Sequence, residues 1–155
     1  KKTAALFAAC TEAAAYSVGV SEEEVKLARL LGEYIGICFQ IKDDIFDYFD
    51  SKEIGKPTGN DMLEGKLTLP VLYALNRAND NQATEIALKV KEGTATLAEI
   101  ARLIAFTKEN GGIEYAVRTM NAYKQKAFGL LASLPDSAIC VALRSYLDYV
   151  VDREK

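Results

Sequence analysis

Apolar residues recur at helical spacing along almost the whole chain. In the longest periodic stretch, residues 21–51, they return every three or four positions and define one face of a helix. They are Val25, Ala28, Leu31, Ile35, Cys38, Ile45, Phe46 and Phe49. The same spacing predicts helices over residues 1–18, 68–77, 82–91, 97–109, 113–133 and 137–152. No strand alternation and no internal repeat is present, so the sequence predicts an all-α helical bundle.

Short motifs mark the limits and contacts of these helices. Ser21 with Glu24 and Thr96 with Glu99 have the spacing of a capping box. Gly32 and Gly36 each weaken a helix by about 1 kcal/mol relative to alanine, so we expect a neighbouring helix or a ligand to approach closely there. The core stripes expected in the second half of the chain are Leu97, Ile100, Ala101 and Ile104, and then Ile139, Leu143, Tyr146, Leu147 and Val150.

Residues 51–66 interrupt the helical pattern. Their turn-forming residues are Gly55, Pro57, Gly59, Asn60 and Gly65. A stretch of this length without regular structure is long for a compact domain, and such loops are usually functional or disordered. This one carries Lys52, Lys56 and Lys66 directly after a helix rich in acidic residues.

The composition excludes several classes of function. The chain has 155 residues, which suits one domain, and a net charge of −3, which argues against a nucleic-acid partner. It contains no histidine, so Ser-His and Cys-His mechanisms are excluded. Cys10, Cys38 and Cys140 lack CxxC spacing and are expected to be buried thiols in a reducing compartment, the cytoplasm. No apolar run is long enough for a membrane span.

Three acidic residues stand in the apolar helix that precedes the loop. Asp43 and Asp47 are four residues apart and project from one face, with Asp44 beside them. Like charges at this spacing repel one another, so a positive partner is expected in front of them. A divalent cation such as Mg²⁺, shared with a phosphate, would fill this role. The alternative is a solvated acidic face, which is common on helices.

Several motifs together resemble the second aspartate-rich region of trans-polyprenyl diphosphate synthases, in the medium- to long-chain form exemplified by octaprenyl synthases. The matching stretches cover nearly half of the chain in the family order. They are Lys2-Thr3-Ala4, the DDxxD run from Phe39 to Asp47, the loop from Gly55 to Asp61, and Glu64-Gly65-Lys66-x-Thr68-Leu69-Pro70.

The resemblance implies an isoprenoid synthase fold and a prenyltransferase. Such enzymes ionise an allylic prenyl diphosphate, let isopentenyl diphosphate attack the carbocation, and remove a proton to restore the alkene. The resemblance also implies Mg²⁺ as cofactor and a homodimer for the full-length enzyme. Magnesium and lysine charges would make the diphosphate a better leaving group.

Residue roles are implied by the same resemblance. Asp43, Asp44 and Asp47 would bind Mg²⁺, and Lys2 and Lys56 would contact the allylic diphosphate as catalytic groups. Thr3 and Gln40 would line the site, and Phe39 would lie beside the isopentenyl group. Lys66 would bind substrate or, like Asp61, act as a loop-closing or supporting group.

Two family features do not occur in this sequence: the first aspartate-rich motif and the Gly-Lys-x-x-Arg site for isopentenyl diphosphate. We therefore expect residues 1–155 to be the C-terminal portion of a single isoprenoid synthase domain, to be inactive alone, and to expose apolar helix faces. The end of the chain, Arg153 to Lys155, is expected to be a solvated helix end. Product length cannot be assigned, because the residues that floor the cavity precede the first motif.

Two other functions stay open at this point. A terpene cyclase-like or squalene-synthase-type relative would share the fold, but the Lys-Thr and Glu-Gly-Lys-x-Thr-Leu-Pro stretches favour the elongating enzymes. A non-catalytic helical subunit of a heteromeric prenyl synthase would be expected to lose the aspartates that this chain keeps.

Overall fold

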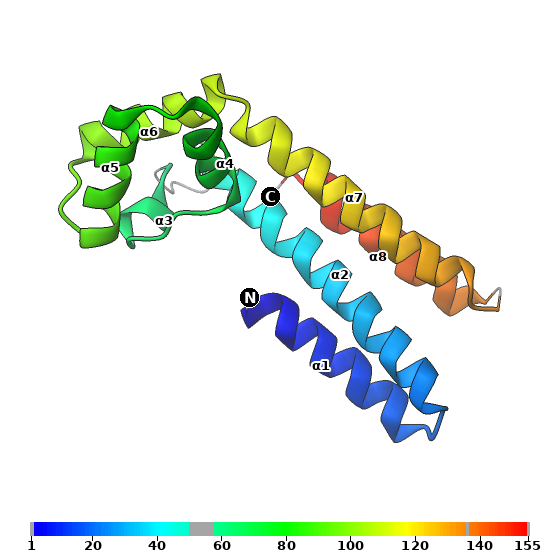
Figure 1. Ribbon diagram of the computed structural model, residues 1–155. Coiled ribbons are helices and arrows are strands. Elements are labelled where there is room, and N and C mark those ends of the chain that lie inside the picture. Colours follow the sequence, from blue (N-terminus) through cyan, green and yellow to red (C-terminus); the bar gives the residue numbers. More distant parts are fainter. Residues whose placement is uncertain (1, 50–57, 136, 155) are drawn as a thin grey trace. The chain divides into compact units, whose positions relative to one another are not determined.

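The computed structural model describes residues 2–49, 58–135 and 137–154, and every regular element in these ranges is an α-helix (Figure 1). The predicted all-α class is confirmed. The helices are α1 (Lys2–Ser17), α2 (Glu22–Phe46), α3 (Asn60–Leu63), α4 (Leu69–Ala78), α5 (Asn81–Glu92), α6 (Leu97–Glu109), α7 (Gly112–Ala132) and α8 (Ala138–Asp152). They form two compact units: unit 1 is Lys1–Lys42 with Thr119–Lys155, and unit 2 is Asp43–Arg118. Helices α2 and α7 each contribute residues to both units.

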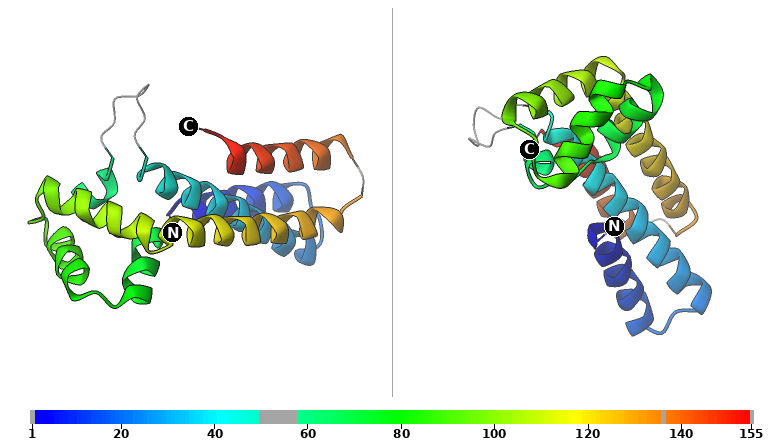
Figure 2. Two further views of the ribbon diagram at one scale, coloured as in Figure 1. Left: turned by 90° about the horizontal axis from the view of Figure 1, so that it is seen from above. Right: turned by 60° about the vertical axis from the view of Figure 1, so that its left-hand side comes forward.

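Unit 1 contains two antiparallel helix pairs, α1 with α2 and α7 with α8 (Figures 1 and 2). Glycines allow α1 to approach α2 closely. A Cβ added at Gly36 would lie 2.6 Å from the Cα of Ala4, and one at Gly32 would lie 2.5 Å from the carbonyl oxygen of Phe7. The close approach of a neighbouring helix expected at these glycines is confirmed.

Helix α2 also packs against α7 within unit 1. The Cys38 thiol lies 3.5 Å from the carbonyl oxygen of Met120, and the rings of Tyr34 and Tyr123 are 5.6 Å apart between centroids. The core of this unit is formed by buried residues of all four helices: Ala8, Leu31, Ile35, Cys38, Met120, Ala127, Leu131, Cys140, Leu147, Val150 and Val151.

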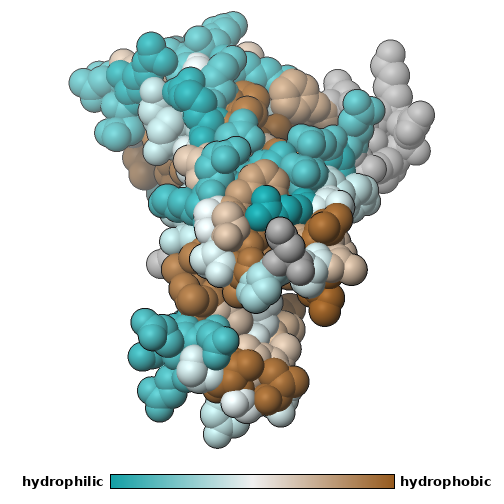
Figure 3. All heavy atoms as spheres, turned by 90° about the vertical axis from the view of Figure 1, so that its right-hand side faces the viewer, coloured by the Kyte–Doolittle hydropathy of each residue, from teal (hydrophilic) through white to brown (hydrophobic). Residues whose placement is uncertain are grey.

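Apolar side chains also lie on the surface, as Figure 3 shows for one face of the molecule. On α8, Ile139 is 71% exposed and Tyr146 is 40% exposed, so their placement in the core was wrong. The buried residues of this helix are Cys140, Leu147, Val150 and Val151, a face rotated from the predicted one. Exposed apolar residues on α8 and on α1 agree with the expectation of uncovered helix faces.

Unit 2 is built around α6, which packs against α4 and α5. Its core includes Tyr48, which comes after the end of α2, and Met62 of α3. Val71, Ala83, Ile86, Ala87, Val90, Ile100, Leu103 and Ile104 complete it. Ile100 and Ile104 are thus buried as predicted, whereas Leu97, the first residue of α6, is 71% exposed.

Both predicted capping boxes are present. At α6 the Glu99 N–H donates to the Thr96 hydroxyl (3.3 Å), and the Glu99 carboxylate accepts from the Thr96 N–H (2.8 Å). The same pair of bonds joins Ser21 and Glu24 at the start of α2. These local contacts fix where the two helices begin.

Three expectations need correction. Helix α2 ends at Phe46, not near residue 51, because the next N–H groups form turn bonds, Tyr48 to Ile45 and Phe49 to Phe46. The stretch 51–66 is not free of regular structure, because α3 lies within it. Cys10 is exposed, although Cys38 and Cys140 are buried as predicted.

Candidate functional site

Two of the predicted metal ligands, Asp43 and Asp44, lie in the last turn of α2. Asp44 is 9% exposed and Asp43 is half-buried. The carboxyl end of a helix carries partial negative charge, so anions there are unfavourable and cations favourable. The helix itself supplies no basic residue in this turn. Mg²⁺ is commonly held by one or two carboxylates together with substrate phosphates, and this pair of oxygen donors fits that requirement.

The third predicted ligand, Asp47, directly follows the last residue of α2, and its carboxylate bonds to α3. Its Oδ1 accepts a hydrogen bond from the Asn60 N–H (2.9 Å) and its Oδ2 accepts one from the Asp61 N–H (3.1 Å). Its carbonyl oxygen accepts a third from the Gly59 N–H (2.9 Å). The Asp47 N–H donates to the Asp43 carbonyl oxygen (3.3 Å), the bond of a helical turn, so Asp47 lies one turn after Asp43 at the end of α2.

Asp61 and Lys66 are joined within unit 2. The Lys66 N–H donates to the Asp61 carbonyl oxygen (2.8 Å), and the Lys66 ammonium lies 3.7 Å from Oδ1 of Asp61 while also pairing with Glu64. Burial raises the pKa of the Asp61 carboxyl above its usual value. The Asp47 carboxylate adds to this rise and Lys66 opposes it. The arrangement agrees with a supporting role for Asp61.

A second group of predicted residues lies in unit 1. The Thr3 hydroxyl donates to Oε1 of Gln40 (2.8 Å), which joins α1 to α2. The Phe39 ring lies 5.7 Å from the Phe7 ring between centroids. Lys2 begins α1 and is exposed. The family resemblance alone assigned Thr3 and Gln40 to one site. In the structure the two residues are direct neighbours.

Arg153 is the residue of this region that the sequence prediction missed. Its guanidinium lies 4.2 Å from the centroid of the Phe39 ring, and it donates to the Phe39 carbonyl oxygen at 3.3 Å. Burial lowers the pKa of the nearby Lys42 ammonium, and the positive charge of Arg153 adds to the effect. Arg153 is half-buried, so the expectation of a solvated helix end was wrong for this residue.

A sequence model of the family described as Polyprenyl synthetase matches residues 1–107. The chain belongs to the polyprenyl synthetase family. Heptaprenyl diphosphate synthase component 2 of Geobacillus stearothermophilus is 36% identical over 155 residues, which are 99% of this chain and 47% of that protein. This chain thus spans about half the length of the curated relatives that it matches.

Solved structures of isoprenyl synthases have the same all-α fold. A geranylgeranyl pyrophosphate synthase from Bacteroides thetaiotaomicron is similar with a TM-score of 0.94 and 78% identity, over 97% of this chain and 50% of that one. A polyprenyl synthase from Caulobacter crescentus, complexed with calcium and isoprenyl diphosphate, gives a TM-score of 0.85 at 33% identity, over 99% of this chain and 47% of that one. The expected isoprenoid synthase fold is confirmed.

One predicted site residue of this polyprenyl synthetase chain has no described position. Lys56, predicted to contact the diphosphate, lies outside the described residues. Among the described residues, no three cysteine, aspartate or glutamate side chains gather as metal ligands. None of the helices in the described ranges has the length and apolar character of a membrane span.

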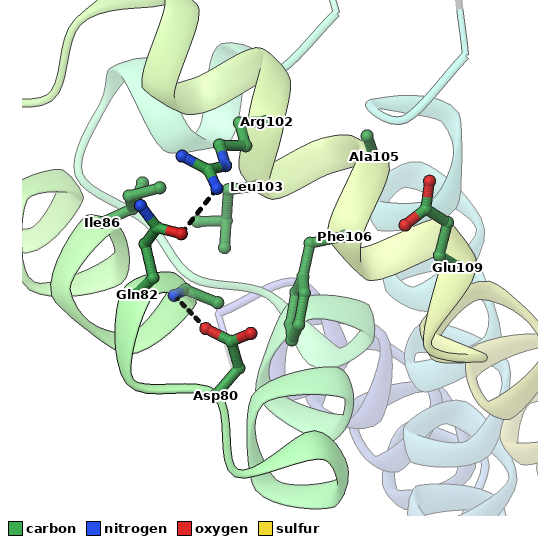
Figure 4. A pocket seen from close by; sticks show the side chains of 9 residues that line it. Asp80, Gln82, Ile86, Arg102, Leu103, Ala105, Phe106 and Glu109 are labelled. Atoms are coloured by element: carbon green, nitrogen blue, oxygen red, sulfur yellow. Dashed lines mark hydrogen bonds between the residues drawn. The ribbon is translucent and has the colours of Figure 1, made fainter.

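Unit 2 also contains a cavity of about 300 Å³ whose lining residues come from α5, α6 and the turn before α5 (Figure 4). Its polar side chains bond to their neighbours: Arg102 donates to Gln82 (2.5 Å), and Asp80 accepts from the Ala83 N–H (2.8 Å). None of the residues predicted from the family motifs lines it. This cavity is separate from the candidate site.

Proposed function

We propose that this chain acts as part of a prenyltransferase that condenses isopentenyl diphosphate head-to-tail onto an allylic prenyl diphosphate. The observation that carries the proposal is the pair Asp43 and Asp44 in the last turn of α2, at the negative end of the helix. Membership of the polyprenyl synthetase family supports it. The relatives' names and the calcium and isoprenyl diphosphate in the Caulobacter crescentus structure support the substrate class and the need for a divalent cation.

Asp43 and Asp44 would hold Mg²⁺, and the metal would neutralise diphosphate charge so that the allylic C–O bond can break. The carboxylates' own contribution is to fix the position of that charge, since Asp44 is buried and cannot reorient freely. Lys2, Lys56 and Lys66 would balance the remaining diphosphate charge.

The residues of unit 1 would contribute by positioning and by excluding water. The bond from the Thr3 hydroxyl to Gln40 holds the Gln40 amide in one orientation. Phe39, packed beside Phe7, presents an apolar ring suited to the isopentenyl group. An apolar wall protects a carbocation from capture by water.

The proposal is tested in the complete enzyme with Asp43→Asn and Asp44→Asn. Each variant should lower the condensation rate at least about a hundredfold, the usual effect of removing one group that stabilises developing charge. Glu92→Gln, which removes an exposed carboxylate at the end of α5, is the matched control and should leave the rate unchanged. Wild-type rates and unchanged Mg²⁺ dependence in both aspartate variants would contradict the proposal.

A second test uses residues 1–155 alone. Because the relatives are about twice as long and the first aspartate-rich motif does not occur in this sequence, a condensation assay should detect no prenyl transfer. Prenyl transfer by this chain alone would overturn that expectation.

The homodimer and the cytoplasmic location stay predictions. Sedimentation of the complete enzyme tests the homodimer.

The two alternatives are not favoured. The family match and the names of the relatives favour an elongating synthase over a terpene cyclase-like protein. A non-catalytic subunit would not need the carboxylate pair that this chain retains in α2.

A further inference from the structure

The carboxylate of Asp47 is directed at backbone N–H groups of α3. Each of its two oxygens accepts one N–H, from Asn60 at 2.9 Å and from Asp61 at 3.1 Å. The Gly59 N–H adds a bond to the Asp47 carbonyl oxygen. Three consecutive N–H groups therefore converge on a single residue. Successive N–H groups arranged in this way form a binding place for an anion, and here the anion is the Asp47 side chain.

The start of α3 depends on this contact. Gly59, the residue before the helix, has a φ of 82° and no side chain that could accept from the first N–H groups. A Cβ at this position would lie 2.9 Å from both Ile100 and Ile104, so a capping side chain cannot be placed there. Asp47 supplies from a distant part of the sequence the oxygen atoms that a local cap would supply.

The contact with Asp47 also helps to place the residues at the end of α3. Asp61, held through its N–H, accepts the Lys66 N–H on its own carbonyl oxygen and lies 3.7 Å from the Lys66 ammonium. Between them, Gly65 has a φ of 74° and its N–H donates to the Met62 carbonyl oxygen at 3.0 Å. Asp47 is therefore the first of a series of contacts that places Asp61 and Lys66 relative to the end of α2.

We propose that Asp47 is a positioning residue that anchors the segment from Gly59 to Lys66, and that it is not a metal ligand. The proposal rests on the proposed function, in which Asp43 and Asp44 hold the metal. It revises the sequence prediction of three metal-binding aspartates. Both oxygens of the Asp47 carboxylate accept backbone N–H groups.

The first experiment needs no substrate and uses Mn²⁺ as the probe for the metal. In the metal-free wild-type enzyme, the amides of Asn60 and Asp61 should already be protected from hydrogen exchange. In Asp47→Asn these amides should exchange at least about tenfold faster, because a bond to a charged acceptor is lost. Mn²⁺ affinity, measured by electron paramagnetic resonance, should change by less than about threefold. In Asp43→Asn the Mn²⁺ affinity should fall at least about tenfold, while the Asn60 and Asp61 amides should stay as protected from hydrogen exchange as in the wild type.

The second experiment measures substrate kinetics in the complete enzyme. Asp47→Asn should raise the KM for the allylic diphosphate while the Mg²⁺ concentration for half-maximal rate stays within about threefold, since Lys66 is displaced but the metal ligands are not. Lys66→Ala should raise the same KM, and the double variant should show no further increase, because the two residues act through one contact series. A purely structural loss would not produce this selective, non-additive effect.

The outcomes separate this proposal from the proposed function. A fall in Mn²⁺ affinity of about tenfold or more in Asp47→Asn would make Asp47 a ligand and overturn the proposal. The proposal would also be overturned if the Asn60 and Asp61 amides became protected from hydrogen exchange only after metal is added to the wild-type enzyme. This measurement does not depend on the folding of any variant. Additive KM effects would also overturn it. Unchanged affinity in both Asp43→Asn and Asp44→Asn would count against the proposed function, while the exchange data would still decide the role of Asp47.

Discussion

The guanidinium of Arg153 covers one face of the Phe39 ring, with 4.2 Å between its central carbon and the ring centroid, and donates to the carbonyl oxygen of the same residue. The contact joins the first residue after α8 to the C-terminal half of α2. It combines a cation–π interaction with a charge-assisted hydrogen bond. The C-terminal end of the chain is thereby fixed beside a residue that we propose to face substrate.

Arg153→Ala should lower the free energy of unfolding by about 1–2 kcal/mol, because both interactions are lost. Arg153→Lys should restore only part of the loss, since an ammonium lacks the planar shape that stacks on a ring. Urea denaturation measures both values. Glu154→Ala, at an exposed neighbouring position, is the control and should change stability little. An unaffected Arg153→Ala variant would show that the contact does not form.

Gly36→Ala should destabilise the protein by about 1–3 kcal/mol, the usual cost of overpacking. The added methyl group would lie 2.6 Å from the Cα of Ala4, so α1 and α2 would have to separate. Gly129→Ala is the matched control, because this glycine lies within α7 and a Cβ there meets no atom within 4 Å. It should stabilise by up to about 1 kcal/mol through helix propensity. Equal effects at the two positions, measured by thermal unfolding, would rule out the close packing.

The three cysteines should react at very different rates. Burial raises the pKa of the Cys38 thiol to about 11, so at pH 8 only about one molecule in a thousand carries the reactive thiolate there. Cys140 is buried as well, whereas Cys10 is exposed. An aromatic disulfide reagent should therefore titrate one fast thiol in the folded chain and all three after denaturation. Cys10→Ser should remove the fast phase, and a fast phase that survives would disprove the assignment.

Glu99 should make stability depend on pH in the acidic range. Lys89 donates a hydrogen bond to the Glu99 carboxylate, and this bond lowers the pKa of Glu99 to about 2. Hydrogen bonds from the Thr96 N–H and hydroxyl add a weaker effect in the same direction. A depressed pKa means that this carboxylate stabilises the fold fully above its usual pKa of about 4.3, and that the contribution is lost as the pH falls toward 2. Glu99→Gln should therefore differ from wild type above about pH 4.5 and converge with it near pH 2. Glu92→Gln, without these bonds, should show no such convergence in acid unfolding experiments.

The sequence predicted well the features that depend on neighbouring residues. Capping boxes at Ser21 and Thr96 require only residues three positions away, and both are present. The need for small residues at Gly32 and Gly36 was visible because glycine is costly inside a helix. Family motifs then identified the residues of the candidate site, which helical periodicity alone could not have done.

The errors concern contacts between distant segments. Nothing near Asp47 in the sequence shows that α2 stops at Phe46 or that the Asp47 carboxylate bonds to Asn60 and Asp61. The face of α8 that is buried depends on which helices it meets, so Ile139 and Tyr146 were wrongly placed in the core. Arg153 likewise reveals its role only when Phe39, more than a hundred residues earlier, is placed beside it.

The division of the chain into two units bears on the order of folding. Unit 2 is one uninterrupted stretch, whereas unit 1 is assembled from both ends of the chain. Closing a longer loop costs more chain entropy, and folding slows as contacting residues lie further apart in sequence. Unit 2 should therefore form early, and the α1–α2 pair should wait for α7 and α8 to be available. During synthesis, α1 and α2 would be made before the helices α7 and α8 with which they share the core of unit 1.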